Sequence, residues 1–348
     1  MELCLREVYG NASSIHREGQ AARQALETAR RQVAAAVNAR PDEVVFTSGG
    51  TEANNLALFG ACRALGKRHV VTTAIEHPAV LHPSAELEVT VVPVGASGVV
   101  DPADVEPALR PDTAMVSVMA VNNELGTIQP VHEIAAMARA RGVLMHVDGA
   151  QALGKIPLDF AGLDFLSLSA HKLYGPKGVG ALIARKGAPL RKVTFGGRHE
   201  RDRRPGTENV PGAVGFGAAC ASLAFAGSEL RDRLEASLRA SIEDVVVNCA
   251  ASPRVANTSN VLVRGVEGEP LVIGLDLAGF AVSSGAACSS GAVEPSHVLT
   301  AIGLSRADAR SCLRFSLGRA NTAAQVDALV AALAAVVTRL RKLAPAYV

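Results

Sequence analysis

The sequence predicts an α/β domain with a mostly parallel sheet, followed by a smaller C-terminal α+β domain. Up to about residue 218, short apolar runs rich in Val, Ile and Leu alternate with helical patterns. The runs are nearly continuous in apolar residues, which is typical of parallel strands covered by helices on both faces of the sheet. Beyond that point the strand candidates become fewer. We therefore expect one domain over residues 1–225 and a second over residues 226–348.

Seven segments of the first domain carry the strand pattern, so we expect a seven-stranded sheet. The predicted strands are 43–47, 69–74, 88–94, 113–121, 142–148, 164–170 and 179–185. Helices are predicted at 17–38, 51–66 and 130–141. Ligands of open α/β sheets bind at the carboxyl ends of the strands, so functional residues are expected in the loops that follow these strands.

The second domain is predicted to be smaller and richer in helix. After about residue 218 a long helical stretch is expected, and the strand candidates are 244–249, 258–263 and 313–318. The last helix should begin near Asn321, a residue type favoured at helix N-caps. Its apolar stripe predicts a packing face. The stripe consists of Val326, Leu329, Val330, Leu333, Val337 and Leu340.

Composition narrows the class of protein. The 348 residues are 49% hydrophobic and 20% charged, with a formal charge of +2 and only 3% aromatic residues, which does not favour nucleic acid as a partner. The start resembles no signal peptide and no run approaches about 20 apolar residues, so we expect a cytoplasmic protein without membrane contact. The cysteines show no metal-ligand spacing, which predicts reduced thiols and no metal site. They stand at positions 4, 62, 220, 249, 288 and 312.

The first candidate functional segment is the turn Thr47-Ser48-Gly49-Gly50-Thr51-Glu52, between a predicted strand and a predicted helix. Glycines allow a phosphate to approach the backbone, and the N-terminus of a helix offers unpaired N–H groups. The turn fits either phosphate binding or a tight structural turn.

Two further strand ends carry charged residues. Asp148 ends the run GVLMHVD, where a carboxylate could keep a pyridinium nitrogen protonated or could cap a helix. Lys172 follows the run DFLSLSA, where it could form a Schiff base or be an ordinary surface charge. Together with the glycine turn, the three strand ends supply partners for a phosphate, a ring nitrogen and an imine in chain order.

The sequence resembles a known family over nearly its whole length. It resembles the NifS/IscS-like cysteine desulfurases, which are fold type I enzymes of the class V aminotransferase group that depend on pyridoxal 5'-phosphate. The motifs that carry the resemblance are GNASSIHREG, FTSGGTEANN, EHPAV, VNNELGT, HVDGAQALGK, SAHKLYGPKGVG, GRHERDRRPGTEN, SSGAACSSG and LRFSLGR. Any one of these motifs is weak, but several of them in this order are specific.

The resemblance implies a role for each matching residue. Lys172 would form the Schiff base, Asp148 would face the ring nitrogen, and Gln151 would contact the ring hydroxyl. His77 would stack on the ring and move protons, and Thr207 would reach the phosphate from a second subunit, which implies a homodimer. The other phosphate contacts would be Gly50, Thr51, Ser169 and His171, and the substrate carboxylate would be bound by Asn123 and Arg314. Without the motifs, each residue has a structural alternative: His77 could cap a helix, Arg314 could form a surface ion pair and Asn123 could be a turn residue.

Cys288 is predicted to be the reactive thiol. It lies in the run SSGAACSSG, whose small residues leave little to bury and predict a mobile, exposed loop. The resemblance implies conversion of L-cysteine to L-alanine with the sulfur held on Cys288 as a persulfide. The sulfur would then pass to an acceptor or an iron–sulfur scaffold protein. Transient ligation of a cluster by Cys288 is an additional hypothesis.

The beginning of the chain departs from the family pattern. Family members usually begin with a short strand and a helix, whereas MELCLREVYGNASS resembles the end of that helix. We therefore expect a large domain shortened at its N-terminus, with cofactor binding less affected than turnover. Three alternatives stay open: a selenocysteine lyase, another class V aminotransferase activity, and a catalytically weakened homologue that binds a scaffold protein.

Overall fold

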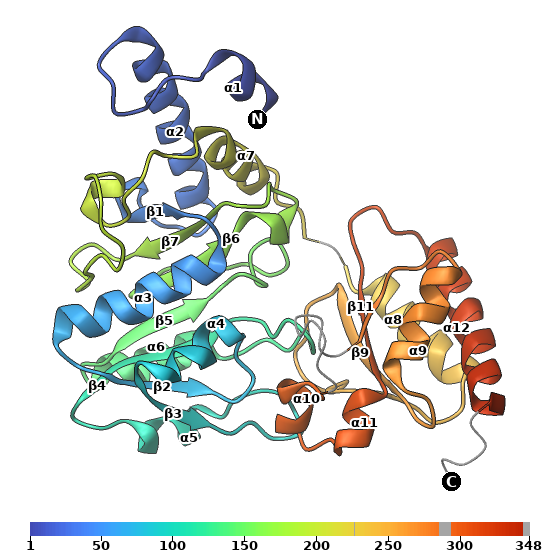
Figure 1. Cartoon of the computed structure of the whole chain (residues 1–348). Coiled ribbons are helices and arrows are strands. Elements are labelled where there is room, and N and C mark those ends of the chain that lie inside the picture. Colours follow the sequence, from blue (N-terminus) through green and yellow to red (C-terminus); the bar gives the residue numbers. More distant parts are fainter. Residues whose placement is uncertain (226, 285–293, 344–348) are drawn as a thin grey trace. The chain divides into compact units, whose positions relative to one another are not determined.

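The computed structural model describes residues 1–225, 227–284 and 294–343 (Figure 1). The chain forms two compact units. The first unit consists of Met1–Val92, Asp101–Val121 and Gln129–Phe225. The second consists of Pro93–Val100, Asn122–Ile128 and Ala226–Val348.

The first unit is built on a seven-stranded, mostly parallel sheet, as the apolar runs predict. Its strands are β1 (Val44–Thr47), β2 (His69–Thr73), β3 (Glu88–Val92), β4 (Thr113–Met119), β5 (Leu144–Asp148), β6 (Phe165–Ser169) and β7 (Gly180–Ala184). Their order is β1-β7-β6-β5-β4-β2-β3. Strand β7 runs antiparallel to both of its neighbours, and all the other pairings are parallel. Strand β1 therefore points in the same direction as β5 and β6.

The strand sequences explain why this sheet is covered on both faces. Every residue of β1, β2, β4, β6 and β7 is buried. Because successive side chains of a strand point to opposite faces, burial of a whole strand requires cover on both faces. One apolar cluster joins Val45 of β1, Leu56 of α3 (Gly50–Leu65) and Met115 of β4.

Helices of the first unit connect and cover these strands. Helix α3 packs against β4, β5, β6 and β7, while α2 (Arg17–Ala35) packs against α7 (Val210–Ala221). The remaining α-helices are α1 (Glu2–Glu7), α4 (Pro78–Leu81), α5 (Pro102–Val105) and α6 (Val131–Ala140). Short 3-10 turns are η1 (Pro41–Glu43), η2 (His82–Ala85), η3 (Glu106–Ala108), η4 (Ala170–Leu173) and η5 (Glu200–Asp202).

The second unit has a four-stranded antiparallel sheet in the order β10-β11-β9-β8. The strands are β8 (Val245–Val247), β9 (Thr258–Val263), β10 (Ser283–Ser284) and β11 (Cys312–Ser316). The helices are α8 (Glu229–Ser241), α9 (Gly268–Leu277), α10 (His297–Ala301), α11 (Arg306–Arg310) and α12 (Ala323–Leu343). Leu238 of α8, Val261 of β9, Leu271 of α9 and Leu333 of α12 belong to one buried core.

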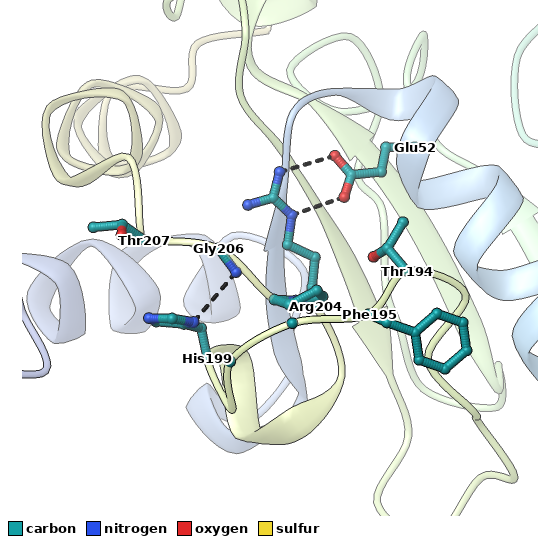
Figure 2. Close-up of a pocket in the computed structure, with 10 residues that line it drawn as sticks. Glu52, Thr194, Phe195, His199, Arg204, Gly206 and Thr207 are labelled. Atoms are coloured by element: carbon teal, nitrogen blue, oxygen red, sulfur yellow. Dashed lines mark hydrogen bonds and ion pairs between the residues drawn. The ribbon is translucent and has the colours of Figure 1, made fainter.

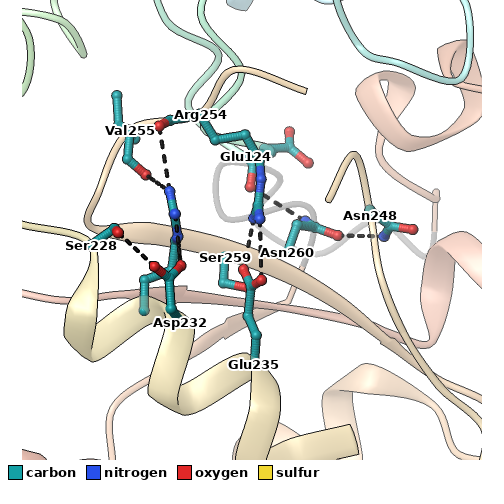
Figure 3. Close-up of polar contacts among 10 residues, drawn as sticks. Glu124, Ser228, Asp232, Glu235, Asn248, Arg254, Val255, Ser259 and Asn260 are labelled. Carbon is teal, nitrogen blue, oxygen red and sulfur yellow. Dashed lines mark hydrogen bonds and ion pairs between the residues drawn. The ribbon is translucent and has the colours of Figure 1, made fainter. Parts of the chain in front are cut away.

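Two stretches that the sequence analysis assigned to the first domain, 93–100 and 122–128, belong to the second unit. Long-range hydrogen bonds hold them there. The backbone N–H of Val255 donates to the Gly126 carbonyl at 2.9 Å, and the Thr127 hydroxyl donates to the Gly98 carbonyl at 2.8 Å. The Asn260 amide donates to the Glu124 carbonyl at 3.4 Å (Figure 3).

A buried ion pair fixes the same region of the second unit. Arg254 donates to both carboxylate oxygens of Glu235, at 2.7 and 3.1 Å, and the Ser259 hydroxyl donates to Glu235 at 2.8 Å (Figure 3). The paired side chains are 4% and 7% exposed, so solvent screens the pair only weakly. Arg254 thereby anchors the strand bridge that it forms with Thr127.

Helix boundaries in the C-terminal region differ from the prediction. Helix α12 begins at Ala323, and its N-cap is Thr322 rather than Asn321. The Thr322 hydroxyl accepts from the Gln325 N–H at 3.3 Å, and the Thr322 N–H donates to the Gln325 side chain at 3.1 Å. The Asn321 side chain instead accepts from the Gly318 N–H at 2.6 Å. The long helical stretch expected after residue 218 is two helices, α7 and α8.

Within the described part of the chain, α12 is also the one helix long and apolar enough to cross a membrane by composition alone. Six of its residues are buried in the core of the second unit, and most of its other apolar residues are alanines. Packing against that core therefore accounts for the buried Val and Leu residues of α12.

Candidate active site

Three strand ends of the first unit meet at one edge of the sheet. Gly50 follows β1 at the start of α3, Ala150 follows β5, and Ser169 is the last residue of β6. A Cβ atom placed on Gly50 would lie 3.5 Å from the Ser169 Cβ and 3.7 Å from the Ala150 Cβ, so the three strand ends lie close together. This edge is where ligands of open α/β sheets bind.

The turn after β1 leads directly into helix α3. Gly49 is the N-cap of α3 and has no side chain to cap the first N–H groups, so these groups are available to an anion. Gly180 of β7 makes this turn possible, because a Cβ on Gly180 would lie 2.7 Å from the Gly49 carbonyl carbon. The Thr47 hydroxyl donates to the Gly49 carbonyl at 2.9 Å and fixes the turn.

Asp148 is a buried carboxylate at the end of β5, with 6% of its surface exposed. The Asn54 amide of α3 donates to its Oδ2 at 2.7 Å, and the Ala150 N–H donates to its Oδ1 at 2.9 Å. No helix lies between β5 and β6, so the alternative of a helix N-cap is wrong. The two hydrogen bonds instead fix the Asp148 carboxyl group at the end of β5.

His77 caps helix α4, as its position before Pro78 suggests. Its Nδ1 accepts from the Ala79 N–H at 3.0 Å, so the neutral ring carries its hydrogen on Nε2. Capping and a role at the site are compatible, because capping occupies only one ring nitrogen.

Glu76, which precedes His77, is completely buried, and the sequence analysis did not single it out. Its Oε1 accepts from the Thr73 hydroxyl at 2.7 Å and from the Met119 N–H at 2.9 Å. Burial, with a further contribution from the charge of Asp148, raises the pKa of Glu76 to about 8. Glu76 therefore ties the turn that carries His77 to the end of β4.

Substituting Glu76→Gln should change how stability depends on pH. A carboxyl whose pKa is higher in the folded state binds its proton more tightly there, so its contribution to stability declines as pH rises from the unfolded value, 4.5, to about 8. Between pH 5 and pH 8 the glutamine variant should gain about 3 kcal/mol in free energy of unfolding relative to the wild type. Urea denaturation of both proteins at the two pH values measures this; parallel pH profiles would contradict it.

Lys172 and its neighbours form the short turn η4 after β6. Lys172 is exposed, and the Ser169 hydroxyl lies 3.0 Å from His171 Nδ1. Burial and the charges of Lys172 and Lys177 lower the pKa of His171. A neutral His171 can accept the Ser169 proton or donate its own, depending on the tautomer.

Two other predicted cofactor contacts belong to the first unit. The Gln151 side-chain oxygen accepts a hydrogen bond from Lys155, four residues along the chain. Thr207 lines a pocket together with Glu52 of the first turn of α3 (Figure 2). The role of Thr207 toward a second subunit stays a prediction.

The predicted substrate residues Arg314 and Asn123 contact each other in the second unit. Arg314 Nη1 donates to the Asn123 carbonyl at 3.1 Å, and Nη2 donates to the Ser283 hydroxyl at 3.2 Å. Its Nε is buried without a hydrogen-bond partner among the described residues. Arg314 is thus held by neutral oxygens rather than by the surface ion pair that was its alternative.

Glu124, beside Asn123, is a buried carboxyl that the sequence analysis missed. The Ser296 hydroxyl donates to its Oε2 at 2.6 Å. Burial raises the pKa of Glu124 to about 7, although Ser296 and the charge of Arg314 act in the opposite direction.

The described cysteines are unsuited to nucleophilic chemistry. All five are unpaired, and all but Cys249 are buried. Burial raises the pKa of Cys62 and Cys249 to about 11 and that of Cys220 and Cys312 to about 12. Cys249, expected within a strand, lies after the end of β8 with a left-handed φ of 54°. Cys288 lies outside the described residues.

Comparison with known proteins assigns the chain to a family. The model of the aminotransferase class-V family matches residues 1–329. A cysteine desulfurase from Nostoc sp. is 44% identical over 357 residues, which cover 98% of this chain and 89% of that protein. The chain belongs to the class V aminotransferase family, among its cysteine desulfurases.

Solved structures of this family share its architecture. A NifS-like protein superposes with a TM-score of 0.90 at 36% identity, over 97% of this chain and 94% of that one. A structure described as SspA in complex with cysteine gives a TM-score of 0.82 at 35% identity, over 91% of this chain and 93% of that one. The fold is therefore that of the fold type I enzymes.

Class V aminotransferases and cysteine desulfurases depend on pyridoxal 5'-phosphate, and the strand-end residues fit that cofactor. The uncapped first turn of α3 suits a phosphate, buried Asp148 suits a protonated ring nitrogen, and Lys172 suits an imine. Within the described chain, no group of three or more His, Cys, Asp or Glu is arranged to hold a metal ion.

Asn54 is the site residue that sequence reasoning could have found. It lies within the motif FTSGGTEANN, four residues after Gly50, and so in the helix that the glycine turn opens. Glu76 and Glu124 lie in the motifs EHPAV and VNNELGT, but neither motif reveals that its carboxyl is buried. That burial depends on residues distant in sequence, since Glu76 is bonded to Met119 at the end of β4 and Glu124 to Ser296.

Proposed function

We propose that this chain is a pyridoxal-phosphate-dependent cysteine desulfurase that releases sulfur from L-cysteine and forms L-alanine. The supporting observation is the meeting of three strand ends, at which Asp148 is buried and oriented by Asn54. A carboxylate oriented in this way has the chemistry that a pyridine nitrogen requires. The Nostoc relative carries the same activity in its name.

The residues of the chain divide the work between binding and proton transfer. Gly50, Thr51, Ser169 and His171 hold the phosphate, Gln151 contacts the ring hydroxyl, and Asn123 and Arg314 bind the substrate carboxylate. When bound, the cofactor withdraws electrons from the substrate α-carbon. Lys172 Nζ holds the cofactor and then takes the proton from that carbon. His77 would stack on the ring and would move protons through Nε2, since its Nδ1 accepts from the Ala79 N–H.

Cys288 accepts the sulfur in this proposal. Its thiolate forms a bond to the substrate sulfur while the carbon–sulfur bond breaks, and the electron pair of that bond stays with carbon, which takes up protons and leaves as alanine. The enzyme retains a persulfide. The raised thiol pKa values of Cys62, Cys220, Cys249 and Cys312 support assigning this step to Cys288.

The proposal extends to the compartment, the oligomeric state and the sulfur acceptor. We propose a cytoplasmic homodimer in which Thr207 reaches the phosphate of the partner subunit. The five unpaired cysteines of the described chain fit a reducing compartment. The persulfide then delivers sulfur to an acceptor protein or an iron–sulfur scaffold.

Turnover of L-cysteine tests the proposed function directly. The purified full chain, loaded with pyridoxal phosphate and supplied with a thiol reductant, should yield alanine and sulfide in equal amounts. L-selenocysteine and an amino-acid/keto-acid pair should be run in parallel to test the alternatives of a lyase and an aminotransferase. Cofactor binding without turnover of any of the three substrates would favour a scaffold-binding homologue, and preference for one of the other two substrates would overturn the assignment.

A further inference from the structure

The loop of residues 194–207 reaches the first turn of helix α3. With Glu52 it lines a pocket of about 540 Å³ (Figure 2). The loop supplies Thr194, His199, Arg204 and Thr207 to this pocket, whereas α3 supplies only Glu52. The pocket therefore joins two segments that are far apart in sequence.

Arg204 of the loop and Glu52 of α3 form a bidentate ion pair. Arg204 Nε donates to Glu52 Oε1 at 2.8 Å, and Nη2 donates to Oε2 at 3.3 Å (Figure 2). Glu52 Oε2 also accepts from the Ser48 N–H at 2.7 Å, within the phosphate turn. The side chains of Arg204 and Glu52 are 26% and 25% exposed, so solvent screens the pair only in part.

The loop that carries Arg204 is held in place by a second, more deeply buried pair. Arg30 donates to both carboxylate oxygens of Glu200, at 2.8 and 2.7 Å, and the Phe46 N–H donates to Glu200 at 2.8 Å. Glu200 and the next two residues have left-handed φ values of 46°, 58° and 63°, which turn the chain sharply. The approach of Arg204 to Glu52 is thus set by the fold, since the loop is fixed four residues earlier.

A carboxylate at Glu52 creates an electrostatic conflict. It lies one residue after Thr51, in the helix turn assigned to the phosphate, and two negative groups so close together repel each other. Burial acts to raise the pKa of Glu52, but the hydrogen bonds from Arg204 and Ser48 outweigh it and hold that pKa below its ordinary value. Glu52 is therefore ionised, and its charge has to be compensated.

We propose that Arg204 is a positioning residue for the cofactor phosphate: it neutralises Glu52 and holds that carboxylate against Ser48, away from the anion. Glu52 then shapes the turn without repelling the phosphate. This inference rests on the proposed function, because it assumes that pyridoxal phosphate binds at the first turn of α3.

The test compares pyridoxal phosphate with pyridoxal, which lacks the phosphate. Cofactor-free full chain is titrated with each compound, and binding is followed by visible absorbance. Arg204→Ala should weaken pyridoxal phosphate roughly 10-fold and leave pyridoxal unchanged, because only the phosphate meets the uncompensated Glu52 charge. Arg204→Lys should retain most of the affinity.

Two further variants remove the charge that Arg204 compensates. Glu52→Gln, which still accepts from Ser48, should restore phosphate-specific affinity in the Arg204→Ala background. Alone it should bind pyridoxal phosphate at least as tightly as the wild type does.

Asp202→Asn is the matched control. Asp202 lies in the same loop and forms a solvent-accessible ion pair with Lys192 at 2.8 Å, and asparagine tolerates the left-handed backbone of this position. This variant should bind both compounds as the wild type does. Equal weakening of both compounds in Arg204→Ala, or no rescue by Glu52→Gln, would overturn the inference. A wild-type protein that binds neither compound would instead refute the proposed cofactor.

Discussion

Substituting Lys172→Ala should abolish turnover of L-cysteine, by at least about 1000-fold, because the chain loses both the cofactor link and the proton acceptor. Cofactor attachment gives an independent readout. Borohydride should fix pyridoxal phosphate covalently to the wild type, as a mass increase on the peptide that contains Lys172, and should fix none to the variant.

The control for this experiment is Lys186→Ala, an exposed lysine just after β7. It should keep both activity and labelling, since it lies outside the strand-end site. Labelling of another lysine in the wild type, or variant activity within tenfold of the parental rate, would refute the assignment of Lys172.

Substituting Cys288→Ala should separate cofactor binding from sulfur transfer. The variant should bind pyridoxal phosphate with the affinity and colour of the wild type, because no proposed cofactor contact involves Cys288. Sulfur release should fall by roughly 100-fold or more, since the nucleophile is missing. Alanine and sulfide measured on the loaded enzyme, together with mass spectrometry for a persulfide, provide the readout.

Cys249→Ala is the matched control for Cys288. Cys249 is the described thiol that is not fully buried, yet burial raises its pKa to about 11 and its Sγ donates to the Ala96 carbonyl at 3.4 Å. It should therefore be dispensable for turnover. A Cys288→Ala protein that releases sulfur at the parental rate would exclude the persulfide mechanism.

The sheet was predictable from the sequence because most of its strands are rich in apolar residues. Every residue of five of the seven strands is buried, and each of the seven predicted segments contains one observed strand. Strand direction was not predictable in the same way. Nothing in the residues of β7 distinguishes an antiparallel strand from a parallel one.

Strand and helix ends were less predictable, for reasons that can be named. The predicted strand 113–121 extends two residues beyond the end of β4 at Met119. The N–H of Ala120 still bonds to the Asp148 carbonyl of β5, but the Ala120 carbonyl accepts from the Gln129 N–H instead of from a strand. The start of α12 was placed one residue early. Thr322 and Gln325 have the spacing of a capping box, and that spacing is a stronger signal than an isolated asparagine.

The candidate site residues that lie at strand ends were predictable from the sequence. Gly50, Asp148 and Ser169 could be associated because parallel strands bring their carboxyl ends to one edge. The ion pairs that hold the surrounding loop in place were not predictable. Arg204 reaches Glu52 and Arg30 reaches Glu200 across 152 and 170 residues of sequence, and only the folded loop determines those pairings.

The pairing of β1 has a consequence for how the protein is made. In the described sheet, β1 hydrogen-bonds to β7 alone, so the strand that leads into the phosphate turn has no neighbour until Ala184 has left the ribosome. Contacts of such long sequence separation form slowly. We therefore expect cofactor capture to be a late event in biogenesis, and nascent chains that stop before Gly180 should be unable to bind pyridoxal phosphate however long they are incubated with it.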